Sequence, residues 1–301
     1  MTPVLEFENI VRSYRKSAPV LTGVSMTMSR GDVVALLGRN GAGKTTLIRI
    51  AMGILYPQSG SVRVFGLSPA KFPVEIKARV GYVAEEQMLP GRSTTHELIG
   101  FYRHVFKRWD TALERELLDR FALSTTIRID SLSKGQARQV ALLLAVCHRP
   151  ELLILDEPAG GLDPSARREF LETSIQLLNR EGTAILFSSH YMSDVERLGG
   201  RVVLLDQGRV LLDQALDDLH EEFCVAMIPG GAARDAAAIE RLHGCLRARP
   251  VSNGWHAVFR GSAEEVGGRL HHAFADGTHC VGVPLEELFV ELTGGQRGGD
   301  E

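Results

Sequence analysis

VVALLGRNGAGKTT, residues 33 to 46, is the stretch of sequence that decides the fold of this 301-residue chain. It opens with an apolar, β-rich run, and Gly38 to Thr45 then fit the pattern G-x-x-x-x-G-K-[ST]. A segment of helical period, 44–54, follows directly. A strand, a glycine-rich turn and a helix in this order are the context in which that pattern binds phosphate groups. The stretch therefore predicts a P-loop core that binds a nucleotide.

Each residue type in this loop has a chemical reason. The glycines let the backbone curl so that successive N–H groups face phosphate oxygens, and the start of the following helix adds positive potential. Lys44 can reach the β- and γ-phosphates, and the Thr45 hydroxyl can ligate Mg²⁺. The predicted nucleotide-binding residues of this segment are Gly38, Asn40, Gly41, Ala42, Gly43, Lys44, Thr45 and Thr46.

A second signal comes from the buried-type run 152–155, LLIL, which ends in Asp156, Glu157 and a proline. Two carboxylates then stand at the C-terminal end of a strand, where ligands of α/β sheets bind. Asp156 suits Mg²⁺, usually through a water, and Glu157 is placed to polarise a water for attack on the γ-phosphate. An acidic turn after a strand is common by itself, and it gains this meaning beside a P-loop.

The rest of the chain predicts an α/β fold with a largely parallel sheet, because short apolar runs alternate with longer segments of helical period. We expect strands at 4–10, 33–37, 62–65, 80–83, 152–155, 184–188 and 201–205. Helices are expected at 44–54, within 94–121, at 134–147 and at 164–179. Asp163 followed by Pro164 supplies an N-cap and a first-turn proline for the last of these helices.

The domain organisation follows from changes in this pattern. The stretch 86–150 is mostly helical and interrupts the strand series, which predicts an inserted helical subdomain. After Leu219, Gly and Ala become frequent, and patterns such as WHAVFR at 255–260 predict a small separate α/β unit. We therefore expect a P-loop NTPase core with a mixed sheet at 1–220, a small C-terminal α/β accessory domain at 221–294, and a disordered tail at 295–301.

Composition excludes several classes of protein. With 44% hydrophobic and 24% charged residues the chain is neither disordered nor fibrous. No run approaches the roughly 20 apolar residues that cross a bilayer, and the start, MTPVLEFENI, lacks the pattern of a secretory signal. The net charge of −3 gives no basic field for a nucleic-acid partner. These features predict a cytoplasmic protein with no nucleic-acid partner.

A third motif separates the P-loop families. Ser131-Leu-Ser-Lys-Gly-Gln136 begins a helical segment ahead of the carboxylate strand. Here the sequence resembles the ATP-binding cassette family, which carries an LSGGQ-type signature at this place. This chain reads LSKGQ, with a lysine at the first glycine position. By this resemblance Ser133, Gly135 and Gln136 would bind nucleotide, because the hydroxyl, the backbone N–H and the helix N-terminus face a γ-phosphate.

Further residues match the family in the expected order. Tyr14 looks like the aromatic residue that stacks on adenine, although packing at a strand edge would also account for it. Gly160-Gly-Leu-Asp163 looks like the D-loop at the dimer interface, and a plain helix N-cap at Asp163 is compatible with that. His190 looks like the switch histidine that contacts the γ-phosphate. Glu85 stands where many members have the glutamine of the Q-loop, and it would still reach Mg²⁺ or the attacking water.

The resemblance covers about residues 4–220 and implies an ATPase whose cofactors are ATP and Mg²⁺. It implies Glu157, His190 and Glu85 as catalytic residues, and Thr45, Asp156 and Glu85 as metal ligands. The segment PLEELFVELTGG, 284–295, is similar to the tail of single-cassette ATPases of export systems.

The implied function is that of an ATP-hydrolysing subunit of a transporter. It would dimerise on ATP with a second copy or a paralogous cassette. It would drive a separate membrane permease, to which it binds peripherally at the inner face of the cell membrane.

Two other functions stay open from the sequence. A soluble cassette ATPase acting on DNA would need a long heptad-patterned insertion, and one acting on ribosomes would need tandem cassettes; the sequence has neither feature. A nucleotide-binding regulator without turnover is disfavoured because Glu157 and His190 are both present. Measured ATP hydrolysis separates this last alternative from a transport ATPase.

Overall fold

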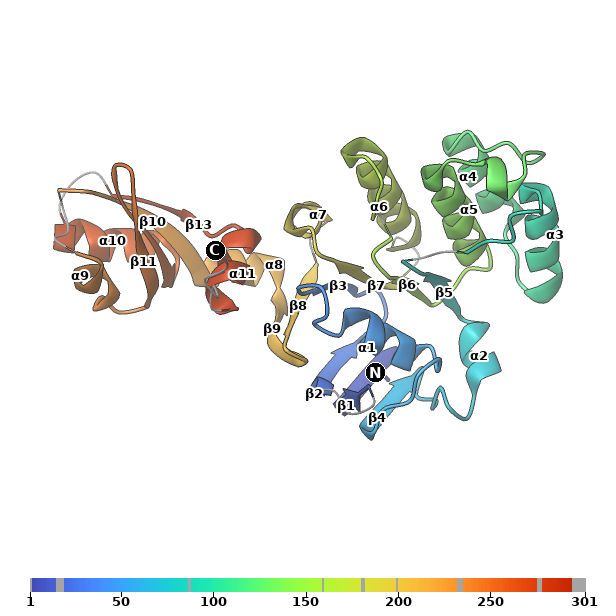
Figure 1. Cartoon of the computed structure of the whole chain (residues 1–301), viewed down its shortest axis with the longest axis horizontal. Coiled ribbons are helices and arrows are strands. Elements are labelled where there is room, and N and C mark those ends of the chain that lie inside the picture. The colour runs from blue at the N-terminus through green and yellow to red at the C-terminus, as the bar shows by residue number, and fades with distance from the viewer. Residues whose placement is uncertain are drawn as a thin grey trace. The chain divides into compact units, whose positions relative to one another are not determined.

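The computed structural model describes residues 2–14, 19–85, 88–158, 160–179, 182–198, 200–231, 235–274 and 278–293. The chain forms two compact units, Met1–Asp213 and Gln214–Glu301 (Figure 1). The sequence pattern changes after Leu219, a few residues beyond the point where the units divide. The tail predicted to be disordered, 295–301, lies outside the described residues.

The first unit is built on a six-stranded sheet with the order β5-β6-β7-β3-β8-β9. Neighbours from β5 through β8 are parallel. A two-residue turn joins β8 to β9, and only antiparallel neighbours allow such a turn. The predicted mixed sheet is thereby confirmed. The strands are β3 (Val33–Leu37), β5 (Val80–Val83), β6 (Leu152–Leu155), β7 (Ala184–Ser189), β8 (Arg201–Asp206) and β9 (Arg209–Ala215).

A second, three-stranded sheet of order β2-β1-β4 is antiparallel and consists of β1 (Leu5–Ser13), β2 (Pro19–Met28) and β4 (Ser59–Val64). Its apolar side chains share one core cluster with residues of β3, β6 and β7 and of the helix that follows the P-loop. The strand expected at 62–65 begins earlier and ends at Val64, because Phe65 has a left-handed φ of 54°. The sequence did not predict β2, whose exposed and buried residues largely alternate.

Several helices of the first unit begin at N-terminal capping residues. Thr94 and Glu97 form a capping box, and the Asp110 carboxylate accepts hydrogen bonds from two backbone N–H groups of the next helix. Figure 1 shows α3, α4 and α5 together as the predicted helical lobe. The helices are α1 (Lys44–Ala51), α2 (Pro73–Lys77), α3 (Thr95–Val105), α4 (Thr111–Arg120), α5 (Lys134–Val146), α6 (Pro164–Asn179) and α7 (Met192–Leu198), with a 3₁₀ turn at Ile129–Ser131.

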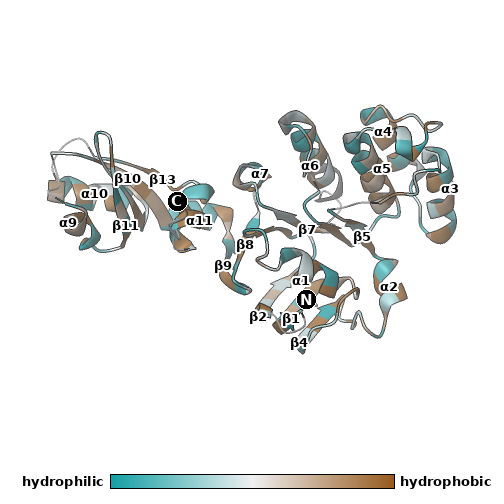
Figure 2. Ribbon diagram, viewed as in Figure 1, coloured by the Kyte–Doolittle hydropathy of each residue, from teal (hydrophilic) through white to brown (hydrophobic). Residues whose placement is uncertain are grey.

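The second unit has an antiparallel sheet of order β11-β12-β10-β13. Its chain order β10-α9-β11-β12-α10-β13 is a βαββαβ arrangement with its own hydrophobic core. Most of the segment 284–295 forms the helix α11, with Leu285 and Leu288 buried, and Figure 2 shows both hydrophilic and hydrophobic residues on this helix. The elements are α8 (Leu216–Glu222), β10 (Phe223–Pro229), α9 (Ala236–Glu240), β11 (Cys245–Val251), β12 (Gly254–Arg260), α10 (Ala263–Phe274), β13 (His279–Gly282) and α11 (Leu285–Leu292).

None of the helices in the described residues combines the length and apolar character needed to cross a membrane.

Candidate nucleotide-binding site

The P-loop connects β3 to α1 and has a backbone that only glycine adopts easily. Gly38 has φ 156°, and a Cβ there would lie 2.5 Å from the carbonyl oxygen of Leu205. Gly43 has φ 108°, and its Cβ would lie 2.6 Å from Cδ2 of Leu21. The two glycines therefore let neighbouring strands approach the loop closely while it turns into the helix.

Lys44 is buried at the start of α1 and already has two partners. Its Nζ donates a hydrogen bond to the carbonyl oxygen of Gly38 at 2.8 Å and lies 3.2 Å from Oε1 of Glu157. The side chains of this ion pair are only 6% and 9% exposed. The sheet thus brings together Lys44, the predicted phosphate-binding residue, and Glu157, the predicted catalytic carboxylate.

Glu157 lies at the centre of the site. Its Oε2 is 2.8 Å from Nδ1 of His190, which comes from the end of β7. Its backbone N–H donates to Oγ of Ser188 at 2.8 Å, and its φ of 43° is left-handed. The carboxylate is therefore held between a buried ammonium group and an imidazole, on a residue whose backbone conformation only its surroundings maintain.

Asp156 is buried beside Glu157 and accepts two hydroxyl hydrogen bonds at Oδ1, from Thr45 at 3.1 Å and from Ser188 at 2.8 Å. Burial raises the pKa of the Asp156 carboxyl, and the two hydroxyl groups oppose that shift. One carboxylate and one hydroxyl beside a phosphate site are the hard oxygen donors that Mg²⁺ uses, with substrate phosphates and waters completing its shell. The residues present fit the predicted cation.

Other predicted nucleotide-binding residues surround this centre. The Tyr14 hydroxyl lies 3.2 Å from Oγ1 of Thr46, and the Arg12 guanidinium lies 5.5 Å from the Tyr14 ring centroid. The Tyr14 ring is partly exposed, as a surface that stacks on a base must be. In the loop itself, Asn40 and Gly41 are exposed and Ala42 is buried.

The signature segment forms a helix N-terminus. Oγ of Ser133 accepts from the Gln136 N–H at 3.2 Å, and the Gln136 side chain accepts from the Ser133 N–H at 3.0 Å. This capping box leaves Ser133 exposed and Gly135 half-buried. In the part of the chain that the structure describes, no hydrogen bond or ion pair joins 132–136 to the P-loop. Within the described residues of one copy, the signature and the P-loop are therefore not directly bonded.

The structure supports the predicted helix N-cap at Asp163, while it leaves the predicted metal-binding role of Glu85 untested. Oδ1 of Asp163 accepts from the N–H groups of Ser165 and Ala166, so the N-cap expected there is present. Glu85 is exposed just after β5, and its backbone carbonyl accepts from Arg138 at 3.0 Å. Among the described residues its carboxylate has no hydrogen bond to Thr45 or Asp156. Its role as a metal ligand stays a prediction.

Sequence reasoning missed two residues at this centre. Ser188 bridges the Asp156 carboxylate and the Glu157 backbone, and Arg138 donates to the carbonyl groups of Glu157 and Pro158. The position of Ser188 two residues before His190, at the end of an apolar strand, was an available signal. Nothing in the sequence pattern marked Arg138.

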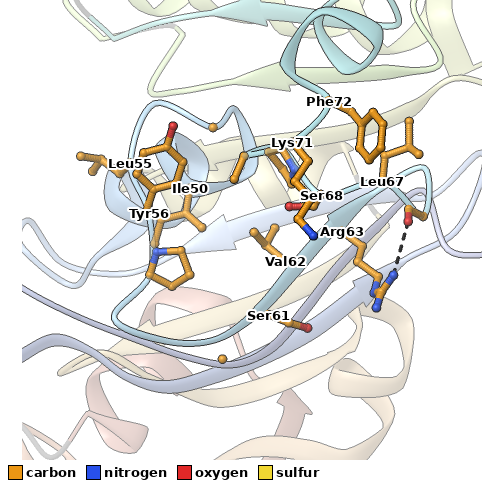
Figure 3. A pocket seen from close by; sticks show the side chains of 16 residues that line it. Ile50, Leu55, Tyr56, Ser61, Val62, Arg63, Leu67, Ser68, Lys71 and Phe72 are labelled. Carbon is orange, nitrogen blue, oxygen red and sulfur yellow. Dashed lines mark hydrogen bonds between the residues drawn. The ribbon is translucent and has the colours of Figure 1, made fainter.

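The first unit also has a pocket away from the nucleotide-binding site. The pocket in Figure 3 has a volume of about 430 Å³ and lies among the end of α1, β4 and the loop that follows. Its lining includes Ile50, Tyr56, Val62 and Phe72, and Arg63 donates to the carbonyl oxygen of Gly66 at 3.5 Å. No residue of the P-loop lines it. The chemistry of the nucleotide site is therefore set by side-chain groups at the strand ends, and this apolar pocket takes no part in it.

A P-loop after β3, two carboxylates after β6 and a histidine after β7 define a P-loop ATPase. Comparison with known proteins narrows this class. Residues 21–160 match the family described as "ABC transporter". The chain belongs to the ABC transporter family and is an ATP-binding, ATP-hydrolysing subunit of that kind.

Individual relatives agree with this assignment. The chain is 35% identical to the daunorubicin resistance ATP-binding protein DrrA3 of Streptomyces coeruleorubidus, over 92% of each chain. It is 32% identical to the Nod factor export ATP-binding protein I of Rhizobium meliloti, over 96% of this chain and 88% of that one. A solved ATP-binding subunit of an ABC transporter superimposes with a TM-score of 0.66 at 30% identity, over 72% of this chain and 92% of that one.

Proposed function

We propose that this chain hydrolyses Mg²⁺-ATP with Glu157 as the general base. The observation that carries the proposal is the position of the Glu157 carboxylate, with Lys44 at one oxygen and His190 at the other. A general base must stay close to the γ-phosphate and must have an orienting partner. Lys44 belongs to the loop that cradles phosphates, and His190 supplies the orienting hydrogen bond.

The ion pair between Lys44 and Glu157 suggests the order of events. ATP brings phosphate oxygens to the P-loop, and Lys44 turns from the Glu157 carboxylate and the Gly38 carbonyl to these more highly charged partners. One Glu157 oxygen is then free to accept a proton from the attacking water. Thr45 and Asp156 would hold Mg²⁺, whose charge offsets that of the β- and γ-phosphate oxygens. His190 keeps the other Glu157 oxygen in place throughout.

The signature residues act on the nucleotide of a second copy in this proposal. Ser133 and Gly135 lie at the N-terminus of α5, where a γ-phosphate would meet a hydroxyl, N–H groups and the positive end of the helix. The exposure of Ser133, and the lack of a hydrogen bond or ion pair to the P-loop within the described residues, support a site shared between two chains. The partner is a second copy or a paralogous cassette.

We further propose that the chain drives export through a separate membrane permease and binds that permease at the inner face of the cell membrane. The names of two relatives, one a resistance protein and one an export protein, support this direction of transport. The unit from Gln214 onward holds none of the proposed nucleotide-site residues, and we propose an accessory role for it.

The experiment that tests this proposal begins with detergent-solubilised membranes of cells that express the tagged chain. A polytopic membrane protein should co-purify with it, and the complex should hydrolyse ATP faster than the isolated chain. Glu157→Gln should give the same complex without the hydrolysis. Recovery of an active ATPase with no membrane protein at any detergent condition would contradict the permease proposal.

A further inference from the structure

Arg138 makes three hydrogen bonds beside the nucleotide site, and the proposed mechanism does not use it. It lies in α5, two residues after the signature, and is half-buried. Its Nη1 donates to the carbonyl oxygen of Glu157 at 3.0 Å and to that of Pro158. Its Nη2 donates to the carbonyl oxygen of Glu85 at 3.0 Å. One guanidinium group therefore joins three segments that are far apart in the sequence.

The backbone of Glu157 needs such a partner. A non-glycine residue with φ 43° persists only where its surroundings hold it. The Glu157 N–H is held by Oγ of Ser188, and its carbonyl oxygen accepts from Arg138 and from the Gly160 N–H at 3.1 Å. Hydrogen bonds thus hold Glu157 at both its N–H and its carbonyl, and these two groups set the direction in which the carboxylate leaves the backbone.

We propose that Arg138 is a positioning residue that ties the signature helix α5 and the Glu85 segment to the backbone of Glu157. A planar guanidinium with donors in a fixed fork can hold two segments at once, and a lysine ammonium offers one donor atom for both. A shift of α5 or of Glu85 therefore moves the general base. This inference rests on the proposed role of Glu157 and adds a link between ATP hydrolysis and the placement of the helical lobe.

The test uses the full chain and three variants. Arg138→Ala removes the fork, Arg138→Lys keeps the charge and the packing of the stem, and Arg115→Ala removes an exposed arginine of α4 as the matched control. We expect kcat for ATP hydrolysis to fall about 10- to 100-fold in Arg138→Ala, because small misplacements of a catalytic group have effects of this size. Arg138→Lys should fall between that variant and the wild type, and KM should stay within about 2-fold.

A double-mutant cycle separates positioning from a general structural effect. Arg138→Ala should cost much less in the Glu157→Gln background, because the residual rate no longer passes through the carboxylate that Arg138 positions. Single-turnover reactions with long incubation measure these low rates. If Arg138 had only a structural role, Arg138→Ala would lower the rate of hydrolysis equally in the wild-type and Glu157→Gln backgrounds. The melting temperature of Arg138→Lys would fall as well.

Each outcome decides one of the two ideas. The positioning role is overturned if Arg138→Lys and Arg138→Ala both keep the wild-type kcat. It is also overturned if Arg138→Ala lowers the rate of hydrolysis equally in the wild-type and Glu157→Gln backgrounds. Both results leave the proposed function intact. Near wild-type hydrolysis by Glu157→Gln alone overturns the proposed function itself. If Arg138→Ala does not fold, the kcat of Arg138→Lys at unchanged KM and melting temperature carries the test.

Discussion

Replacement of Glu157 by glutamine should abolish turnover while it strengthens ATP binding. The amide keeps the shape of the side chain but cannot accept the proton of the attacking water, so we expect kcat to fall by about 10² to 10⁴. In the ligand-free chain Glu157 competes with ATP for Lys44, because the two groups form an ion pair at 3.2 Å with almost no solvent exposure. The same substitution therefore removes a competitor of the nucleotide.

The size of the gain in ATP affinity follows from the loss of the ion pair between Lys44 and Glu157. Two opposite unit charges about 3 Å apart attract each other by about 5 kcal/mol at an effective dielectric constant of about 20, and the cost of removing both groups from water offsets much of that attraction. A net weakening of about 1 to 2 kcal/mol in the ligand-free pair corresponds to ATP affinity that rises about 5- to 30-fold. The free energy of unfolding of the ligand-free chain should fall by a similar amount.

Calorimetric titration with Mg²⁺-ATP and a steady-state ATPase assay measure the two effects. Ser133→Arg is added to both proteins in the titration so that closure with a second copy does not contribute to the affinity. Glu151→Gln is the matched control, because that carboxylate pairs with Arg79 on the surface. Weaker ATP binding by Glu157→Gln than by its parent, or hydrolysis near the wild-type rate, would refute the reasoning.

Three further predictions address single groups. Lys44→Ala should weaken ATP binding at least about tenfold, since no water replaces its charged contact to the phosphates, and unchanged affinity by calorimetry would remove the P-loop assignment. Ser188→Ala should lower the free energy of unfolding by about 1 to 3 kcal/mol and reduce kcat, because the Asp156 carboxylate and the Glu157 N–H lose a shared partner; chemical denaturation and ATPase rates check this. Burial lowers the pKa of His148 to about 4, so the unfolded chain binds the extra proton first as pH falls below about 6.5. The free energy of unfolding should then decrease by up to about 1.4 kcal/mol per pH unit on acidification toward pH 4, and a wild-type slope equal to that of His148→Phe would contradict this.

The sequence predicted β3, β5 and β6 well because almost all of their residues are buried. The runs 33–37, 80–83 and 152–155 are continuously apolar, and the structure has β3, β5 and β6 at the same residues. The helix α6 begins at Pro164, as the Asp163-Pro164 pair indicates. By contrast, β2 carries a glycine and largely alternating polar residues, and its register depends on pairing with β1, which no local pattern shows.

The same distinction holds for the site. Motif spacing identified Lys44, Glu157 and His190 one by one, since each belongs to a motif that follows a predictable strand. That the Glu157 carboxylate joins the other two side chains depends on the strand order of the sheet, which sequence spacing does not encode. Sequence reasoning missed Arg138 because its hydrogen-bond partners are backbone carbonyl groups, which no residue type identifies.

The central claim is that each ATP site combines the P-loop of one copy with the signature of another, and a mixing experiment tests it most directly. Lys44→Ala and Ser133→Arg proteins should each be inactive alone, while Ser131→Arg, beside the signature, should stay active. In an equal mixture half of the dimers are mixed and have one intact site of two, so activity should return to about a quarter of the wild-type rate. A mixture that stays as inactive as its two components would contradict the shared site.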